Sequence, residues 1–342
     1  MPDDWGGIER YVSYISQALS SRGHSVEATA PEGSPLSKRV GVSVVPINLR
    51  NKMDPVALAA YIRLFQRARY DVVNVHFSPD YTVPALAAKF CGQPNLVLTR
   101  HLAIGWKPRR VRQYSKFYAH IIGVSEAVRR VLVSHSGFSP SFVSAVQAGM
   151  PELTPIVDRQ DSRRRFSMSD DVLNVGVFGR LTVEKGHAPL LEIAKASPKL
   201  KVHVFGDGPE RARLESLAGA QTAFHGYLAD VADALSAVDC IATPSLWDEA
   251  FSLATLEAFC LAKPVVASPR GALPELVQDG VNGFLADPES QQELFLEKLV
   301  TLADDAGLRK ALGANGRSLY ESKFTLDHFG ERIERVYQTL TG

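Results

Sequence analysis

Two glutamates eight residues apart, Glu249 and Glu257, have the type and spacing in this sequence that point most directly to chemistry. Ser252 lies between them and is predicted to cap a helix that carries Glu257 among apolar neighbours. A carboxylate on an apolar helix face is unfavourable unless it has a partner. A ribose diol would be one, because a carboxylate accepts from two hydroxyls, and a buried arginine or lysine is the alternative. The N–H groups at the start of this helix would favour a phosphate or a developing oxyanion.

A second candidate for ligand binding is the segment of residues 179–186, which follows a predicted strand. Its glycines let the main chain approach a ligand closely, and Arg180 and Lys185 place two cations at one strand end, which suits a diphosphate. An ordinary surface loop with solvated charges is the alternative. The Gly-x-Gly pair at residues 206–208 predicts a tight turn before a helix.

Apolar, β-rich runs alternate with helical patterns along the chain, which predicts parallel, doubly wound sheets. In such sheets ligands bind outside the carboxyl ends of the strands, where the segments above are expected to lie. The predicted strands are residues 25–30, 42–47, 72–76, 96–101, 120–124 and 142–146 in the first half, and 173–178, 201–205, 222–225, 240–244, 264–268 and 283–286 in the second.

The length and a polar stretch at residues 151–171 indicate two domains, because 342 residues exceed one ordinary domain. We predict an N-terminal domain of residues 1–152, a linker of 153–171, a C-terminal domain of 172–322, and a C-terminal helix, 323–342, that crosses back to the first domain. Residues 1–150 hold 18 Lys and Arg against 9 Asp and Glu, whereas residues 151–342 hold 20 against 28. The two domains are therefore expected to meet different partners.

Together these segments resemble the retaining glycosyltransferases of family four, whose GT-B fold has two Rossmann-like, doubly wound lobes that face a cleft. The resemblance runs over nearly the whole chain, and its most specific part is the Glu-x7-Glu motif from Glu249 to Glu257. It implies that Glu249 contacts hydroxyls of the transferred sugar and that Glu257 contacts the ribose. It also implies a glycine loop at Gly6 and Gly7 near the donor phosphates and a histidine, His101, near the reacting sugar.

The resemblance divides the predicted site into a catalytic and a donor-binding set. The catalytic set is His101, Arg180, Lys185 and Glu249, and the donor-binding set is Gly6, Gly7, Gly179, Arg180, Lys185, Phe251, Ser252, Leu253 and Glu257. Ala250 and Ser252 depart from the family, which often has glycine or proline at the first position and glycine at the second. Because both side chains are small, we expect that the main chain at these positions can still approach the donor closely.

By this resemblance the chain moves a sugar from a nucleotide-diphosphate sugar to a hydroxyl of a glycan, lipid or other acceptor, for example in cell-envelope polysaccharide. No metal and no cofactor are expected, because the sequence contains no Asp-x-Asp, and Arg180, Lys185 and helix starts would neutralise the leaving diphosphate. Uridine is the commonest donor base of the family, followed by guanosine. A sugar-nucleotide epimerase or hydrolase, or a catalytically impaired nucleotide-sugar-binding protein, is the alternative.

Residues 81–125 contain no acidic side chain and many cations. A basic amphipathic helix there suits an anionic lipid surface or a phosphorylated acceptor, with a solvated basic face as the alternative. We expect a cytoplasmic protein, peripheral on the inner face of the membrane and without a nucleic-acid partner, whose three cysteines are reduced core residues. The cations assigned to this acceptor or membrane side are Arg109, Arg110, Arg112 and Lys116.

The start of the sequence lacks a strand that the pattern requires. The glycine pair Gly6 and Gly7 opens a predicted helix, and in a doubly wound domain such a loop follows the first, central strand. Only five residues precede the pair, and they have a loop composition. We therefore expect Met1 to be an internal methionine, with about 15 residues lost upstream, and the sheet to be interrupted beside the strand that leads to His76.

Overall fold

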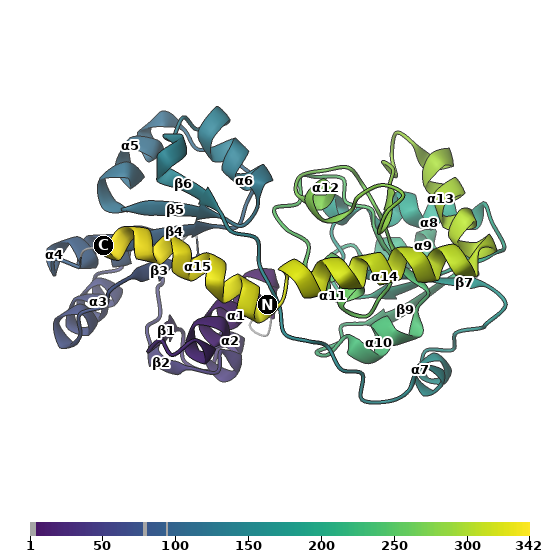
Figure 1. The fold of residues 1–342 in the computed structure, drawn as a ribbon, viewed down its shortest axis with the longest axis horizontal. Coiled ribbons are helices and arrows are strands. Elements are labelled where there is room, and N and C mark those ends of the chain that lie inside the picture. The colour runs from purple at the N-terminus through teal and green to yellow at the C-terminus, as the bar shows by residue number, and fades with distance from the viewer. Residues whose placement is uncertain (1–4, 78–80, 94) are drawn as a thin grey trace. The chain divides into compact units, whose positions relative to one another are not determined.

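The computed structural model of the chain describes residues 5–77, 81–93 and 95–342, which belong to two compact units (Figure 1). Unit 1 contains Met1–Pro151 and Phe324–Gly342, and unit 2 contains Glu152–Lys323. Helices alternate with parallel strands in both, which confirms the predicted α/β class with parallel sheets. None of the described helices combines the length and the apolar character needed to cross a membrane.

The expected strands of unit 1 are all present, each one or two residues shorter than predicted. They are β1 (Glu27–Ala30), β2 (Ser43–Pro46), β3 (Val73–Val75), β4 (Leu96–Arg100), β5 (His120–Gly123) and β6 (Val143–Ala145). The helices are α1 (Gly7–Ser21), α2 (Pro35–Arg39), α3 (Pro55–Arg67), α4 (Val83–Phe90), α5 (Pro108–Phe117), α6 (Glu126–Arg130) and α15 (Leu326–Thr341).

Unit 2 also contains each expected strand. They are β7 (Leu173–Phe178), β8 (Leu200–Phe205), β9 (Thr222–Gly226), β10 (Cys240–Thr243), β11 (Val265–Ala267) and β12 (Gly283–Leu285). The helices are α7 (Arg159–Arg165), α8 (His187–Lys195), α9 (Arg211–Leu217), α10 (Ala232–Ala237), α11 (Leu253–Cys260), α12 (Leu273–Leu276), α13 (Gln292–Asp304) and α14 (Ala306–Lys323).

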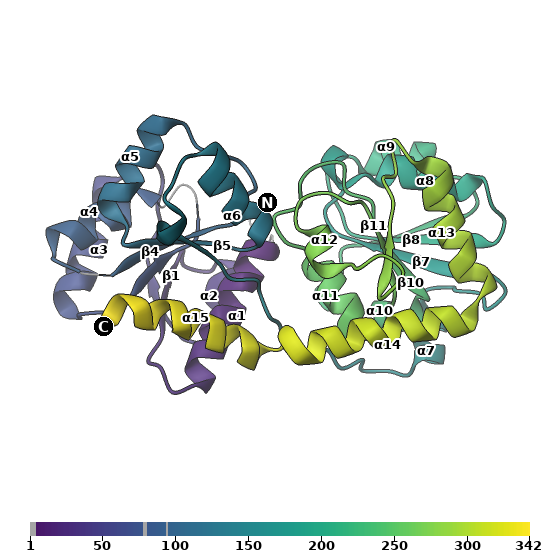
Figure 2. The same ribbon diagram turned by 45° about the horizontal axis from the view of Figure 1, so that its top comes forward.

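The unit 2 strands form one parallel sheet in the order β12-β11-β10-β7-β8-β9. The first strand in sequence, β7, is central, and the later strands add outward on either side of it. Figure 2 shows α8, α9 and α13 over one face and α10, α11 and α14 over the other. Both faces are covered, so most side chains of β7, β8, β10 and β11 are buried, and each buried Val or Leu contributes about 1.5–3 kcal/mol.

The unit 1 strands form two parallel sheets: β1 pairs with β2, and β3, β4, β5 and β6 pair in that order. Among the described residues no ladder joins β1 to β3. The described strands of unit 1 are therefore interrupted beside β3, the strand that leads to His76.

Helix α15 is part of unit 1 and packs against α1. The Arg22 guanidinium, just after α1, lies 2.5 Å from Asp327 and 2.7 Å from Glu334 of α15. Gly149 lies close to the start of this helix, because a Cβ there would overlap the main-chain oxygen of Thr325. The tail from Phe324 is thus held to unit 1 at both its beginning and its middle.

Two expectations need correction. The segment 153–171 is not a free linker, because it belongs to unit 2 and contains α7, which packs on α10. Of the cysteines, Cys240 and Cys260 are buried, but Cys91 is only half-buried and is not a core residue.

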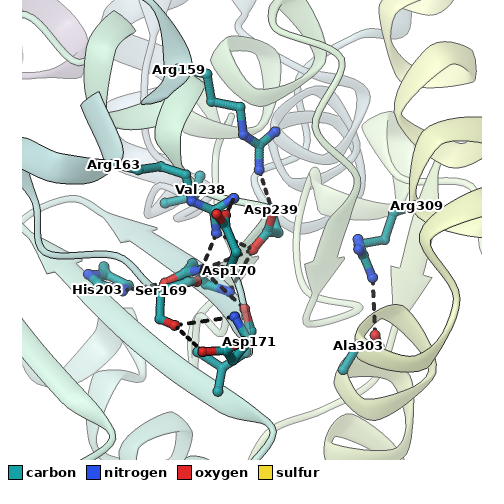
Figure 3. A network of polar contacts seen from close by, with 12 residues as sticks. Arg159, Arg163, Ser169, Asp170, Asp171, His203, Val238, Asp239, Ala303 and Arg309 are labelled. Carbon is teal, nitrogen blue, oxygen red and sulfur yellow. Dashed lines mark hydrogen bonds and ion pairs between the residues drawn. The ribbon is translucent and has the colours of Figure 1, made fainter. Parts of the chain in front are cut away.

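A largely buried carboxylate, that of Asp239, explains why the arginine-rich segment is held in place (Figure 3). Asp239, just before β10, accepts from the Asn174 main-chain nitrogen at 2.8 Å and lies 2.5 Å from Arg159 and 3.3 Å from Arg163 of α7. Burial alone would raise the pKa of Asp239, but the Asn174 hydrogen bonds and the two guanidinium groups more than offset this and lower it. The arginines of α7 therefore bind α7 to the base of the sheet.

We expect Asp239→Asn to lower the free energy of unfolding by about 3 kcal/mol, because it leaves Arg163 part-buried beside a neutral group. The folded-state pKa of Asp239 lies below the unfolded value of about 3.9, so its contribution is present above about pH 4. That contribution is lost as the pH falls through the folded-state pKa, and the difference between wild type and variant should shrink. Urea unfolding at pH 7 and at about pH 3 measures both effects.

The matched control is Asp304→Asn, which removes an exposed carboxylate 2.6 Å from the equally exposed Lys199. Exposed pairs of this kind contribute about 0–1 kcal/mol. Equal losses in the two variants would show that the Asp239 network has no special role in stability.

Candidate functional site

Three loops leave the carboxyl ends of neighbouring strands in unit 2 and contact one another. They are residues 179–186 after β7, 244–252 after β10 and 268–272 after β11, and the three strands are adjacent in the sheet. The Leu246 nitrogen donates to the Glu184 oxygen at 2.8 Å, and the Ala272 nitrogen donates to the Glu249 oxygen at 2.8 Å. The middle loop is thus held by main-chain bonds on both sides.

Two glycines make this approach sterically possible. Gly186 has a φ of +70°, and a Cβ there would overlap the main-chain oxygen of Pro244. Gly271 has a φ of +60°, and a Cβ there would overlap the main-chain atoms of Glu249. A side chain at either position would have both a left-handed backbone and a clash, so the loops need glycine at both.

The predicted Gly-x-Gly turn after β8 supports the same edge of the sheet. A Cβ on Gly206 would overlap the Gly179 oxygen, and a Cβ on Gly208 would overlap the Leu181 oxygen. The Leu181 nitrogen also donates to the Asp207 oxygen at 2.9 Å. The turn is therefore a packing surface for the loop after β7.

The Glu249 side chain is only 7% exposed and has two polar partners. Its Oε1 atom accepts from Lys185 Nζ at 2.6 Å and from Ser245 Oγ at 2.5 Å. Lys185 comes from the loop after β7, and Ser245 comes from the loop after β10. The ammonium group neutralises a carboxylate whose burial would otherwise be unfavourable.

Helix α11 begins where the sequence predicted. Ser252 is its N-cap and accepts from the Thr255 nitrogen at 3.3 Å. Phe251 and Leu253, on either side of the cap, are half-buried, and Glu257 is buried within the helix. Glu249 thus lies just before the start of α11 and Glu257 lies within it, and both side chains are buried.

The two predicted cations differ in their surroundings. Arg180 is exposed, next to Gly179 at the end of β7, whereas Lys185 is two-thirds buried and bound to Glu249. Their contact with a diphosphate therefore stays a prediction. In the described part of the chain, no group of three or more His, Cys, Asp or Glu side chains is placed to hold a metal ion.

In unit 1, His101 follows β4 and lies beside His76, which follows the neighbouring strand β3. His76 Nδ1 and His101 Nε2 are 3.3 Å apart, so one of these nitrogens donates and the other accepts. The Tyr11 ring meets His101 edge-on, with 4.8 Å between ring centroids. Burial, with His76 and Arg100 close by, holds the pKa of His101 well below its usual value, and burial lowers the pKa of His76 to about 3. Both imidazoles are therefore neutral at neutral pH.

The predicted glycine loop of unit 1 opens α1. Gly6 is the N-cap and Gly7 is the first residue of this helix. A Cβ on Gly6 would lie 2.9 Å from a carboxylate oxygen of Glu9, whereas a Cβ on Gly7 would meet nothing within 4 Å. The Glu9 carboxylate thus lies against the helix start, the place where the resemblance implied phosphates.

The predicted basic helix of unit 1 is α5. Its N-terminal half presents exposed cations, and Tyr114 on its other side is buried against Trp106, with ring centroids 4.8 Å apart. One face of α5 lines a shallow hollow of about 390 Å³ formed by Arg109, Arg112, Gln113, Lys116 and Phe117. Arg110 is also exposed on this helix. The four cations assigned to the acceptor or membrane side are thus gathered on one exposed element.

The comparison of the sequence with known families covers both units. The family described as Glycosyltransferase Family 4 matches residues 5–150. The family described as Glycosyl transferases group 1 matches residues 158–319 and so includes the three loops and both motif glutamates. The chain is a group 1 glycosyltransferase.

Relatives of this glycosyltransferase are similar along nearly its whole length. It is 28% identical over 389 residues to D-inositol 3-phosphate glycosyltransferase of Stackebrandtia nassauensis, covering 98% of this chain and 87% of the relative. It is 27% identical over 372 residues to O-antigen chain mannosyltransferase C of Escherichia coli, and the match covers 99% of this chain and 96% of the relative. Among solved structures, HepE of Anabaena in complex with UDP-glucose matches with a TM-score of 0.86 at 21% identity, covering 98% and 97%. A glycosyltransferase of Rickettsia africae matches with a TM-score of 0.86 at 18% identity, and the match covers 98% of this chain and 95% of that one. These structural likenesses show the GT-B fold.

Two side chains of the glycosyltransferase that contact predicted site residues were not found from the sequence. Ser245 bonds to Glu249 through a loop conformation for which the sequence gives no local signal. His76 could have been found, because it ends a predicted strand in the same way as His101, and neighbouring parallel strands end at the same edge of a sheet.

The close approach at Gly271 makes a test of this geometry possible. We expect Gly271→Ala to displace the Glu249 main chain and to reduce glycosyl transfer at least tenfold. The matched control is Gly280→Ala, where φ is +72° but a Cβ would meet nothing within 4 Å. That variant should lose about 1 kcal/mol of stability from its left-handed backbone and keep its activity. Thermal unfolding and initial rates separate the two effects, and equal rates in both variants would contradict the role of Gly271.

Proposed function

We propose that this glycosyltransferase moves a sugar from a nucleotide-diphosphate sugar to an acceptor hydroxyl, with retention of configuration and without a metal ion. The observation that carries the proposal is the buried Glu249 carboxylate, held by Lys185 and Ser245 where the three loops meet. Both of these bonds are made by Oε1, so Oε2 can accept from hydroxyls of the transferred sugar. Glu257, buried in the adjacent helix, would accept from the ribose.

The charge of the leaving diphosphate would be neutralised by groups on the same edge of unit 2. Arg180 and Lys185 share the loop after β7, and the N-terminus of α11 contributes main-chain N–H groups. Fixed donors and cations of this kind stabilise charge as it develops. In the proposed step the bond from the anomeric carbon to the diphosphate breaks, the bond to the acceptor oxygen forms, and the acceptor proton passes to the leaving diphosphate.

In unit 1 we assign a hydrogen-bonding role to His101. Its lowered pKa keeps the imidazole neutral, so it can donate to or accept from a sugar hydroxyl without adding a charge. His76 holds one ring nitrogen of His101 and so orients the ring. Gly6 and Gly7 would let the start of α1 approach the donor phosphates.

Uridine is the donor base that we propose first, and guanosine second. The HepE structures contain UDP or UDP-glucose, which supports the first choice. A relative from Corynebacterium glutamicum, 24% identical over 316 residues, is named as GDP-mannose-dependent, which supports the second. The acceptor proposed is a glycan, lipid-linked or phosphorylated hydroxyl compound of the cell envelope, approached over the cations of α5.

The division of roles between the two glutamates can be measured directly. Glu257→Gln should weaken binding of both the nucleotide sugar and the free nucleoside diphosphate, because the ribose is present in each. Glu249→Gln should reduce transfer but leave binding of the free diphosphate nearly intact. Losing a hydrogen bond to a charged group corresponds to about 1.5–3 kcal/mol, or roughly 10- to 150-fold. Calorimetry with UDP and GDP measures the affinity for the free diphosphate, and rates with and without acceptor measure glycosyl transfer.

The matched control is Glu184→Gln, which removes an exposed carboxylate from the loop after β7. It should change neither binding nor transfer. Equal loss of diphosphate binding in the Glu249 and Glu257 variants would overturn the division of roles. Donor turnover that is independent of acceptor would favour a hydrolase or epimerase, and donor binding without turnover would favour a binding protein.

The cations of α5 predict binding to anionic membranes. The chain should sediment with vesicles containing phosphatidylglycerol but not with neutral vesicles, and binding should fall with added salt. Replacing Arg109, Arg112 and Lys116 together by serine should abolish it. A control with the same change in charge at Lys38, Lys52 and Arg63, which are exposed elsewhere on unit 1, should retain it. Binding that resists salt, or that is lost equally in both triple variants, would contradict this role.

A further inference from the structure

Arg100, the last residue of β4, is a buried cation in unit 1 and is only 4% exposed. Within the described ranges it belongs to no ion pair, and its buried Nε atom has no hydrogen-bond partner. Residues 81–125 contain no Asp or Glu at all. A buried charge is unfavourable unless other groups compensate for it, so the groups that surround Arg100 must supply that compensation.

Two compensating contacts come from the loop of residues 102–107, which joins His101 to α5. Arg100 Nη2 donates to the Ile104 main-chain oxygen at 3.1 Å. The guanidinium group also lies over the Trp106 ring, 4.7 Å from its centroid. A carbonyl oxygen and an aromatic face both attract a cation, and the attraction is stronger away from water. Arg100 therefore binds, at two points, a loop that begins almost directly after it in the chain.

Trp106 is itself fixed from a second side. Its nitrogen donates to Ser136 Oγ at 2.9 Å, just after the π-helical turn Val131–His135. Its ring, 7% exposed, meets the rings of Tyr114 and Tyr81 edge-on, with 4.8 and 6.0 Å between centroids. The loop is thus held at Trp106 by the core of the unit, while its middle residues are exposed.

Arg100 and His101 lie on opposite faces of the strand end. Successive side chains alternate along a strand, and the contacts agree, because His101 meets Tyr11 of α1 whereas Arg100 meets Trp106. The Arg100 oxygen still accepts from the Val124 nitrogen at 3.2 Å. His101 is the first residue after β4, so the position of its main chain depends on the loop that Arg100 holds.

We propose that Arg100 is a positioning residue for glycosyl transfer, because its guanidinium group fixes the loop 102–107 and, through it, the main chain of His101. This role rests on the proposed contact between His101 and the reacting sugar. It requires a planar cation that stacks and donates at the same time, which lysine does not provide. The loop leaves the carboxyl end of β4, the edge at which parallel sheets bind ligands, so its exposed residues Ile104 and Gly105 lie on the side where an acceptor would approach.

The test compares Arg100→Met, which keeps an apolar stem, and Arg100→Lys, which keeps the charge, with the unchanged chain. In both variants we expect amide exchange in residues 102–107 to become about tenfold faster, with no change in unit 2. Calorimetry should show unchanged binding of UDP and GDP, whereas release of the diphosphate from UDP-glucose or GDP-mannose should fall about tenfold. The matched control is Lys89→Met, which removes an exposed cation 5.5 Å from the Phe117 ring and should change none of these values.

Arg100→Ala gives a second measurement, because it leaves space beside Trp106 for a free cation. Ethylguanidinium should restore slow exchange in residues 102–107 and the lost turnover, whereas ethylammonium, which has the same charge, should restore neither. Unchanged exchange in Arg100→Met, faster exchange spread evenly over unit 1, or equal rescue by both ions would overturn the proposal. Exchange does not depend on glycosyl transfer, so local loosening of the loop together with no turnover by the unchanged chain would support the contact and contradict the proposed function instead.

Discussion

The site in unit 2 depends on the neutralisation of one buried carboxylate. Glu249 is nearly inaccessible to water, and its cation, Lys185, comes from a loop more than sixty residues earlier in the chain. Such a pair is favourable only when both groups are fixed at hydrogen-bonding distance. The main-chain bonds that join the loops after β7, β10 and β11, and the glycines at positions 186 and 271 that permit them, maintain that distance.

The same constraint explains why the site lies at the carboxyl edge of a continuous sheet. Three adjacent parallel strands bring three loops to one edge without any long connection, and the helix starts that follow direct N–H groups to the same place. At the opposite edge, Asp239 binds the arginines of α7 and closes the base of the sheet. Carboxylates with little exposure to water thus hold both ends of unit 2, Glu249 within the candidate site and Asp239 within a structural network.

The elements of the fold could be predicted because their causes are local. Runs of β-branched and apolar residues specify the strands, with β7 at its predicted bounds, and Ser252 specifies its helix start through its own side chain. The pairing of Lys185 with Glu249 could not be predicted, because the two residues meet only after the strands are ordered in a sheet. The arginines at 163–165 were misassigned to a linker for the same reason, since Asp239, which holds Arg163, is distant in sequence.

The strand order of unit 1 bears on the orientation of its two imidazoles. His76 follows β3, which borders the interruption, and His101 follows β4, which is paired on both sides. The orientation of His101 depends on its contacts with His76 and Tyr11 as well as on its own strand. A half-buried β3 fixes His76 less firmly than a buried central strand would. His101 is therefore oriented from three elements, its own strand β4, the neighbouring strand β3 through His76, and helix α1 through Tyr11.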